Sequence, residues 1–593
     1  MARNLRPLTG GVPVGYIPGM ASLQAYTSGR QKYWRIVESR RVNGKPRPIP
    51  VLYLGRADNL LARLREAPEL KVASRSHGAV AALWSIASEL GVASIIDRHL
   101  RASGRRASRK GATSESVGEP PHMTDGLTVG QSLALVAIGR ACRATSKRGF
   151  AKWANETTLG ELAGADTDRL DSQHFWEQMD QLPVANIANI ERDILLEVTK
   201  QYPITLRTLL YDGTNFFTFI ASTNERASLP ERGHNKQKRN DLRQVSVAML
   251  CTQEAGIPVW HQTYAGALPD ASEFEQALPL IKQRVEELQG KVKDVTIVFD
   301  KGNVSRANQS RVDDSKLHYV TGLTVASQKK LVATANRHMT SVQVDDDENV
   351  MAYRTRRKIW GKSRTAVVMI SERLKQGQIQ GILQHAATAQ EWLSNLSDTL
   401  KRGRQRRSRK ELEVAIQNRL KGRQHLRDVI EYKLSGEDPK LELTYTFNQD
   451  ALDRLASETL GRLVLITDRH QWTTAEIIGS YRSQAVVAAL FEPLKDHVHV
   501  ALRPQFHWTD QKIQIHVFTC TLAHLLECLL FMKAQSTTLP YRSQEALLDA
   551  LAGVRRATVI QSTGARRKPR VTRQLEEVDS TLAPHLAHLG IAS

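Results

Sequence analysis

Two aspartates occupy similar places in two apolar stretches of the sequence. Asp212 lies within the apolar run 204–219, and Asp300 follows directly after the run 295–299. The β-branched and aromatic residues of these runs predict buried strands, although Asp212-Gly213 can also mark a turn, which we rank second. A lone carboxylate in such a strand is costly to desolvate unless a charged group offsets it. Because hard divalent cations prefer carboxylate oxygens, the two strands predict a shared metal site.

The chain is strongly basic. It has 593 residues and a formal net charge of +22, with 83 lysines and arginines against 61 aspartates and glutamates. A charge excess of this size favours a polyanionic partner, and nucleic acid is the first candidate. We rank the alternative, a generally basic soluble protein, second. The length predicts several domains, and 41% hydrophobic residues are enough for packed cores.

The cysteines and the apolar segments indicate where the protein works. The four cysteines (Cys142, Cys251, Cys520 and Cys528) are scattered, with no CxxC pair. This spacing predicts a reducing compartment and no structural zinc. The N-terminus has no charged-then-apolar signal sequence, and no apolar run is expected to reach membrane-spanning length. We therefore expect a cytoplasmic protein with no membrane partner.

The N-terminal third combines a β-rich part and a helical part. Residues 1–75 predict a small β-rich region with a hairpin turn at Asn43-Gly44. Residues 76–200 have helical periodicity with basic faces, which predicts a DNA-binding region; a plain bundle with a solvated basic face is the alternative. Within it, the segment 101–125 predicts a flexible basic linker. The linker either follows a phosphate backbone or is merely solvated.

The rest of the chain predicts an interrupted α/β core. Three strands, a helix and further strands over 201–325 follow the order of the ribonuclease-H-like fold, and the core resumes over 461–593, which ends in helices and a basic tail. An insertion domain separates the two parts at 326–460. Its basic run 401–410 is either a phosphate contact or a solvated helix face. The predicted fold class is therefore α/β: a ribonuclease-H-like catalytic core with an insertion domain, preceded by a β-rich and then helical DNA-binding region.

The helix predicted after residue 473 carries a recognisable pattern. Residues 481–495 resemble the last catalytic helix of insertion-sequence transposases of the DDE class, in the subgroup with the signature Y-x-x-R-x-x-x-E-x-x-x-x-x-x-K. That subgroup also has a long insertion before the glutamate, as this chain does. Further matching segments are 211–214, 233–242 and 299–303. The ordered set covers nearly the whole chain, although no single motif is decisive.

The resemblance assigns roles to individual positions. It implies that Asp212 and Asp300 are the first two metal-binding carboxylates, with Tyr481 and Lys495 as the signature tyrosine and lysine. Because seven residues are about two helical turns, positions 481, 488 and 495 share one helix face. Position 488 is where the family has its catalytic glutamate, and here it is Ala488.

The chain departs from the family pattern at two positions. Gln484 occupies the arginine position, with Arg482 nearby, and Ala488 cannot bind a metal. Glu492 is one turn further on, but the register argues against it as a replacement. Either the chain is a naturally decayed copy, or the glutamate was replaced so that DNA is held uncut; the otherwise intact pattern favours the second.

The chemistry implied by the resemblance is phosphoryl transfer at transposon ends. Two Mg²⁺ ions about 3.5–4 Å apart, for which Mn²⁺ can substitute, would activate the attacking oxygen and stabilise the leaving oxygen. The implied partners are double-stranded transposon-end and target DNA, with a homodimer in the complex and a bacterial, nucleoid-associated location. We expect DNA contacts from seven further basic or aromatic positions besides Lys495: Tyr481, Arg482, His234, Lys236, Arg404, Arg406 and Arg407. Two alternatives stay open: a DNA-binding protein that has lost catalysis, and a non-transposing nuclease of the same fold.

Overall fold

The computed structural model divides the chain into two compact units. One contains residues 1–74 and 556–575, and the other contains 75–555 and 576–593. The structure describes residues 21–29, 31–42, 45–56, 70–108, 123–221, 223–233, 235, 239–289, 291–345, 348–402, 408–421, 425–438, 440–495, 502, 506–561 and 570–591. The predicted turn at Asn43-Gly44 lies outside these residues, as does 562–569 of the predicted basic tail.

The first unit is built from β-strands. Strands β1 (Ala21–Ser28), β2 (Gln31–Val42) and β3 (Lys45–Arg56) form an antiparallel sheet in that order. A second sheet has the order β19-β18-β4, from β4 (Leu70–Ser76), β18 (Arg555–Gln561) and β19 (Arg570–Leu575). Strands near the two ends of the sequence therefore belong to one sheet.

The second unit begins with helices. They are α2 (Gly78–Glu89), α3 (Val92–Ser108), α4 (Val129–Cys142), α5 (Lys147–Asn155), α6 (Leu159–Ala163), α7 (Ser172–Asp180) and α8 (Val184–Gln201). The short strands β5 (Met123–Thr124) and β6 (Leu127–Thr128) precede α4, which starts with a capping box between Thr128 and Gln131. The linker predicted from residue 101 is wrong in its first part, because α3 continues to Ser108. Alanine and arginine in that segment are strong helix formers.

A nine-stranded sheet forms the centre of the second unit. Its order is β12-β13-β14-β17-β11-β10-β7-β8-β9. The strands that form the predicted core are β7 (Thr208–Thr218), β8 (Arg243–Thr252), β9 (Pro258–Ala265), β10 (Thr296–Phe299) and β11 (His318–Leu323). Strand β8 is antiparallel to both of its neighbours, β7 and β9, whereas β10 is parallel to β7 and β11 is parallel to β10. This mixed α/β arrangement is consistent with the ribonuclease-H-like order predicted from the sequence.

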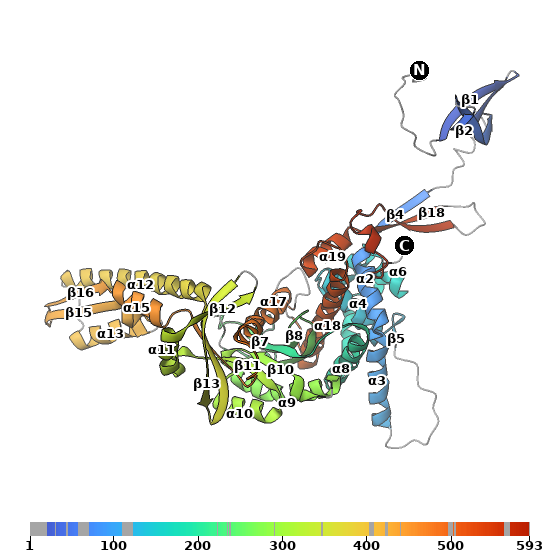
Figure 1. Cartoon of the computed structure of the whole chain (residues 1–593). Coiled ribbons are helices and arrows are strands. Elements are labelled where there is room, and N and C mark those ends of the chain that lie inside the picture. The colour runs from blue at the N-terminus through green and yellow to red at the C-terminus, as the bar shows by residue number, and fades with distance from the viewer. Residues whose placement is uncertain are drawn as a thin grey trace. The chain divides into compact units, whose positions relative to one another are not determined.

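Helices cover both faces of these strands. Figure 1 shows α9 (Asp270–Gln289) and α10 (Arg306–Ser315) on one side and α17 (Gln484–Lys495) on the other. Tyr211 and Phe299 pack against Phe274 of α9, with ring centroids 5.0 and 4.5 Å apart. On the opposite face, Phe216 packs against Phe491 of α17 at 6.4 Å. Since side chains alternate along a strand, even-numbered residues of β7 face α17.

The segment predicted as an insertion has two parts. Strands β12 (Thr340–Asp345), β13 (Glu348–Ile359) and β14 (Lys362–Ile370) extend the central sheet after α11 (Lys329–His338). The remainder has its own apolar core, shared by α12 (Glu372–Lys401), α13 (Arg409–Lys421), α14 (Leu426–Val429), β15 (Ile430–Glu437), β16 (Lys440–Phe447) and α15 (Gln449–Glu458). Helix α14 ends at Val429 and β15 begins at Ile430, because Ile430 and Tyr432 favour a strand.

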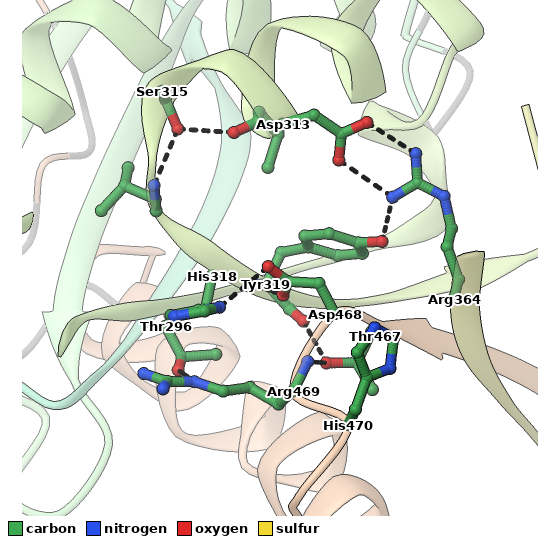
Figure 2. Close-up of polar contacts among 12 residues, drawn as sticks. Thr296, Asp313, Ser315, His318, Tyr319, Arg364, Thr467, Asp468, Arg469 and His470 are labelled. Atoms are coloured by element: carbon green, nitrogen blue, oxygen red, sulfur yellow. Dashed lines mark hydrogen bonds and ion pairs between the residues drawn. The ribbon is translucent and has the colours of Figure 1, made fainter. Parts of the chain in front are cut away.

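A polar network fixes β17 (Arg462–Thr467) next to β11 (Figure 2). The buried Arg364 of β14 makes a bidentate ion pair with Asp313 at 2.7 and 2.9 Å and also contacts the Tyr319 hydroxyl. Burial alone would raise the pKa of Asp313. The hydrogen bonds and positive charge of Arg364 outweigh burial, so the pKa of Asp313 is lowered. Beyond β17, Asp468 accepts from His318 at 2.8 Å. These contacts set where the chain leaves the sheet to enter α16 (Thr474–Arg482).

The C-terminal helices complete the core of the second unit. By length and composition α18 (Asp510–Gln535) could cross a membrane, and the bent pair α2 and α3 could be a second span, contrary to the prediction that no apolar run reaches that length. In the structure 89% of the most apolar window of α18 is buried inside the protein, where the helix contacts α2, α4 and β9. It is therefore packed as a core helix. The next helix is α19 (Gln544–Ala552).

Candidate active site

The strand register brings the two predicted aspartates to the same level of the sheet. In the parallel pair β7–β10, Tyr211 is opposite Phe299, and Asp212 and Asp300 are the next residues on their chains. Both side chains are partly exposed. Asp212 is an internal residue of β7, opposite Met249 of β8, so the turn interpretation of Asp212-Gly213 is wrong. Two carboxylates on adjacent strands provide the oxygen ligands that a hard divalent cation requires.

The helix pair α16–α17 contacts the end of β10 directly. The Tyr481 hydroxyl donates a hydrogen bond of 3.0 Å to Asp300 Oδ1. Burial, with the negative charge of Asp300 added to it, raises the pKa of Tyr481, so the phenol stays protonated at neutral pH. Gln484 accepts from the backbone N–H groups of Asp300 and Phe299 at 2.8 and 3.2 Å, with its amide oriented to place the oxygen toward them. The position that departs from the family's arginine therefore anchors the helix to β10.

A glycine on β11 makes room for this tyrosine. A Cβ atom added to Gly322 would lie 2.8 Å from Tyr481 Oη and 3.3 Å from its Cζ. Real Cβ atoms essentially never come that close to an oxygen. Gly322 thus lets Tyr481 lie over β11 and reach Asp300, which the sequence alone did not indicate.

Ala488 lies on α17, one helical turn after Gln484 and on the same face. Its side chain is exposed, and so is that of Glu492, a further turn along. Among the residues that the structure describes, no group of three or more histidine, cysteine, aspartate or glutamate side chains is arranged to hold a metal.

An acidic residue of α9 was missed by sequence reasoning. Glu273 is 3% exposed and accepts a hydrogen bond from Ser246. Burial raises its pKa to about 7, and the charges of Asp270 and Asp212 act in the same direction. A Cβ on Gly213 would collide with Glu273 Oε1, so a glycine within a strand was the available sequence indication. Glu273 is on the face of β7 opposite Asp212 and responds to its charge.

The other predicted DNA contacts have different surroundings. Arg482 makes a bidentate ion pair with Glu348 at 2.7 and 2.9 Å, and this lowers the pKa of Glu348. The Lys495 amine lies 5.7 Å from the centroid of the Phe491 ring. Five predicted positions lie outside the described residues: His234, Lys236, Arg404, Arg406 and Arg407.

Comparisons with known proteins gave structural likenesses only. No family model and no curated protein matched the chain. It is similar over 79% of its length to 79% of piggyBac transposase in a synaptic complex with hairpin DNA, at 10% identity and a TM-score of 0.35. It is also similar over 37% of its length to 65% of Mos1 transposase paired with a left transposon end, and to 64% of Mos1 mariner transposase in a paired-end complex with Mn. These two have identities of 12% and 11% and TM-scores of 0.15. Likenesses this weak do not decide function, so the assignment below rests on the chain's own residues.

Proposed function

We propose that this chain is a transposase of the DDE class that binds transposon-end DNA and is catalytically inactive because of Ala488. The observation that carries the proposal is the contact between Tyr481 and Asp300. It joins the helix with the tyrosine and lysine signature to the strand pair with the two aspartates. The helix signature and the pair of aspartates are independent features of the sequence. Because the fold brings both to one site, their proximity supports the resemblance.

The residues present fit part of a divalent metal site. Asp212 and Asp300 lie side by side at the end of a parallel strand pair, and both are partly exposed. Magnesium or manganese held there would stabilise negative charge on the reacting phosphate oxygens. The protein's own contribution is orientation: Tyr481 holds one oxygen of Asp300, and Gln484 holds the backbone from which Asp300 projects.

The third position is the reason for the proposed inactivity. A methyl side chain at position 488 provides no oxygen ligand, and the exposed Ala488 leaves space for a longer side chain. With two carboxylates instead of three, fewer charged oxygens offset the desolvation of a cation. We therefore propose that the chain holds end DNA without nicking or joining it.

The test is restoration of the missing carboxylate. Ala488→Glu should nick and join oligonucleotides carrying the transposon end in Mg²⁺, whereas the isosteric Ala488→Gln should remain inactive. Adding Asp212→Ala or Asp300→Ala to Ala488→Glu should abolish activity again. If the unmodified chain cleaves end DNA and Glu492→Gln stops it, Glu492 is the third ligand and the proposal for position 488 is wrong.

The same assay separates the two alternative functions. A nuclease of this fold would cut without joining, and a binding protein that has lost catalysis would do neither even with Ala488→Glu. Ala488 itself is the observation that favours the binding protein as the second candidate.

We further propose a homodimer that holds two DNA ends. Joining both ends of an element in one event requires that both are held together. The insertion 326–460 and its basic run 401–410 are the candidates for contacts to DNA or to the partner subunit. Light scattering with end DNA should give two protein chains per complex. A complex of one chain and one end that completes strand transfer would refute the dimer.

A further inference from the structure

A cavity of about 1030 Å³ lies behind the helix that carries Ala488. Its walls come from α17, α18, the start of α19, the segment 203–205 and the turn between β8 and β9. Val486, Ala489 and Pro493 line it from α17. At about 100° per residue, these three positions lie on the side of the helix roughly opposite Gln484, which faces Asp300. One helix is therefore shared by the candidate active site and the cavity.

Three residues of α18 form a polar cluster at the cavity wall. His524, Glu527 and Cys528 all line the cavity, and their i, i+3, i+4 spacing puts them on one helix face. The Cys528 sulfur is 3.5 Å from His524 Nε2, and His524 Nδ1 is 3.2 Å from a carboxylate oxygen of Glu527. Gln544 donates to the sulfur at 3.3 Å. The thiol of Cys528 also lies within donating distance of the Gly256 carbonyl oxygen, at 3.6 Å.

This order of groups is the one that activates a thiol. A base within reach of the nucleophile, oriented by a third group, is the general arrangement for a nucleophilic side chain. We propose that Cys528 is a nucleophilic modification site that takes a small, uncharged α,β-unsaturated carbonyl compound bound in this cavity. The apolar side chains of the cavity suit a ligand of that kind: Ile204, Leu490, Phe531, Met532 and Leu548.

The reaction is a redox-neutral addition. His524 Nε2 accepts the thiol proton, and the sulfur attacks the β-carbon of the ligand. The sulfur–carbon bond forms as the carbon–carbon π bond breaks, and the electron pair moves to give an enolate. The enolate α-carbon then takes the proton back from His524, so nothing leaves and no oxidant is consumed. Glu527 stabilises the imidazolium between these two transfers.

The electrostatics of His524 agree with this role. Burial alone would lower its pKa, but the facing Cys528 sulfur and the Glu527 carboxylate outweigh burial and raise it to about 10. A more basic imidazole is a better acceptor for the thiol proton, and its protonated form is the state that follows this transfer. Other charged groups around the cavity are Glu254, Glu492, Arg542 and Glu545.

The same helix carries an internal comparison. Cys520 and His516 have the same i, i+4 spacing, with a longer distance of 3.9 Å. Burial and the positive charges of Arg140 and Lys147 lower the pKa of His516 well below its usual range. Burial also raises the pKa of Cys520 to about 11, and this residue is not among those lining the cavity. We therefore expect Cys520 to be inert.

The test uses N-ethylmaleimide as the probe on the folded full-length chain. Labelled cysteines are identified by peptide mass after short reaction times. Cys142 is the most exposed of the four cysteines, and Cys528 is only 2% exposed. Labelling governed by exposure would modify Cys142 first. We expect Cys528 to react first, about tenfold or more faster than Cys142 and Cys520.

Variants and a second reagent make the result decisive. His524→Gln should slow labelling of Cys528 by about tenfold or more, and the matched control His516→Gln should not change it. A maleimide bearing a sulfonate should label Cys528 more slowly than the neutral reagent does, which tests the apolar cavity without any mutation. Labelling of Cys142 first, with Cys528 modified only after denaturation, would overturn the proposal.

The modification should also affect the neighbouring site. An adduct on Cys528 occupies space against the rear of α17, so in the Ala488→Glu protein it should reduce strand cleavage. This arm rests on the proposed function, whereas the labelling does not. Rapid labelling without loss of cleavage would leave the modification site standing and refute the coupling to α17.

Discussion

The contact between Tyr481 and Asp300 gives a prediction whose size follows from the structure. The hydrogen bond is 3.0 Å long and joins a phenol to a carboxylate, both partly exposed. Hydrogen bonds to charged groups contribute about 1.5–3 kcal/mol, and partial exposure places this one near the lower end. In the Ala488→Glu background, we therefore expect Tyr481→Phe to lower the rate of end cleavage by about tenfold, since about 1.4 kcal/mol corresponds to that factor.

Gly322→Ala should produce a loss of similar size by a different route. The new Cβ would lie 2.8 Å from Tyr481 Oη, so the hydroxyl has to move away from Asp300. The matched control is Gly479→Ala on α16, where nothing lies within 4 Å of the added atom. The control should cleave as fast as its parent, because its new methyl group displaces nothing.

The two changes should not be additive. Tyr481→Phe removes the hydroxyl and with it the hydrogen bond to Asp300. The same hydroxyl is the atom closest to the methyl group that Gly322→Ala introduces, so this close contact disappears as well. The double variant should therefore lose little more than either single variant. The assay is a double-mutant cycle on single-turnover cleavage of end DNA in Mg²⁺. Losses that multiply in the double variant would show that Gly322 acts independently of Tyr481, and this explanation of the glycine would then be wrong.

Three further predictions concern stability and affinity. Arg284→Met should destabilise the protein by about 3–5 kcal/mol in urea unfolding, because Arg284 pairs at 2.7 Å with the buried Glu191, which would lose a partner. Glu273, whose pKa is raised from 4.5 to about 7, binds its proton more tightly in the folded state. Stability should therefore fall as pH rises through this range, and Glu273→Gln should remove about 3 kcal/mol of that fall when unfolding is compared at about pH 4 and pH 8. Affinity for end DNA should weaken about a thousandfold from roughly 50 to 200 mM salt if about six phosphates are contacted; a flat dependence would count against nucleic acid as the main partner.

The parts of the site that the sequence predicted are those set by local patterns. The apolar runs around Asp212 and before Asp300 contain enough β-branched and aromatic residues to predict strands. The parallel register that puts the two carboxylates at one level depends on the crossover through α9, which no local pattern specifies. The role of Gly322 depends on Tyr481, far along the chain, passing over β11, so it became visible only in three dimensions.

Other differences have equally physical causes. The helix-forming residues of 101–108 outweigh the flexibility suggested by their charge, and α3 continues through them. Strand β18 pairs with β4, which lies near the opposite end of the sequence. Hydrophobic periodicity predicts a strand but does not indicate which distant strand it pairs with. Glu273 lies in the first turn of α9, where acidic residues are common, so its sequence position did not mark it as special. Burial against Gly213 raises the pKa of Glu273.

The break between α16 and α17 bears on the role that we propose for position 488. Ser483 lies at the break and donates its hydroxyl to the Gly479 carbonyl at 2.9 Å, while Gln253, from the turn after β8, donates to the Ser483 oxygen at 2.9 Å. Tyr481 before the break and Gln484 after it are both held at Asp300. The first turn of α17 is thus fixed from two directions before the chain reaches residue 488. A glutamate introduced there would project from a helix whose orientation is already set, so little reorganisation would be needed for it to act with Asp212 and Asp300.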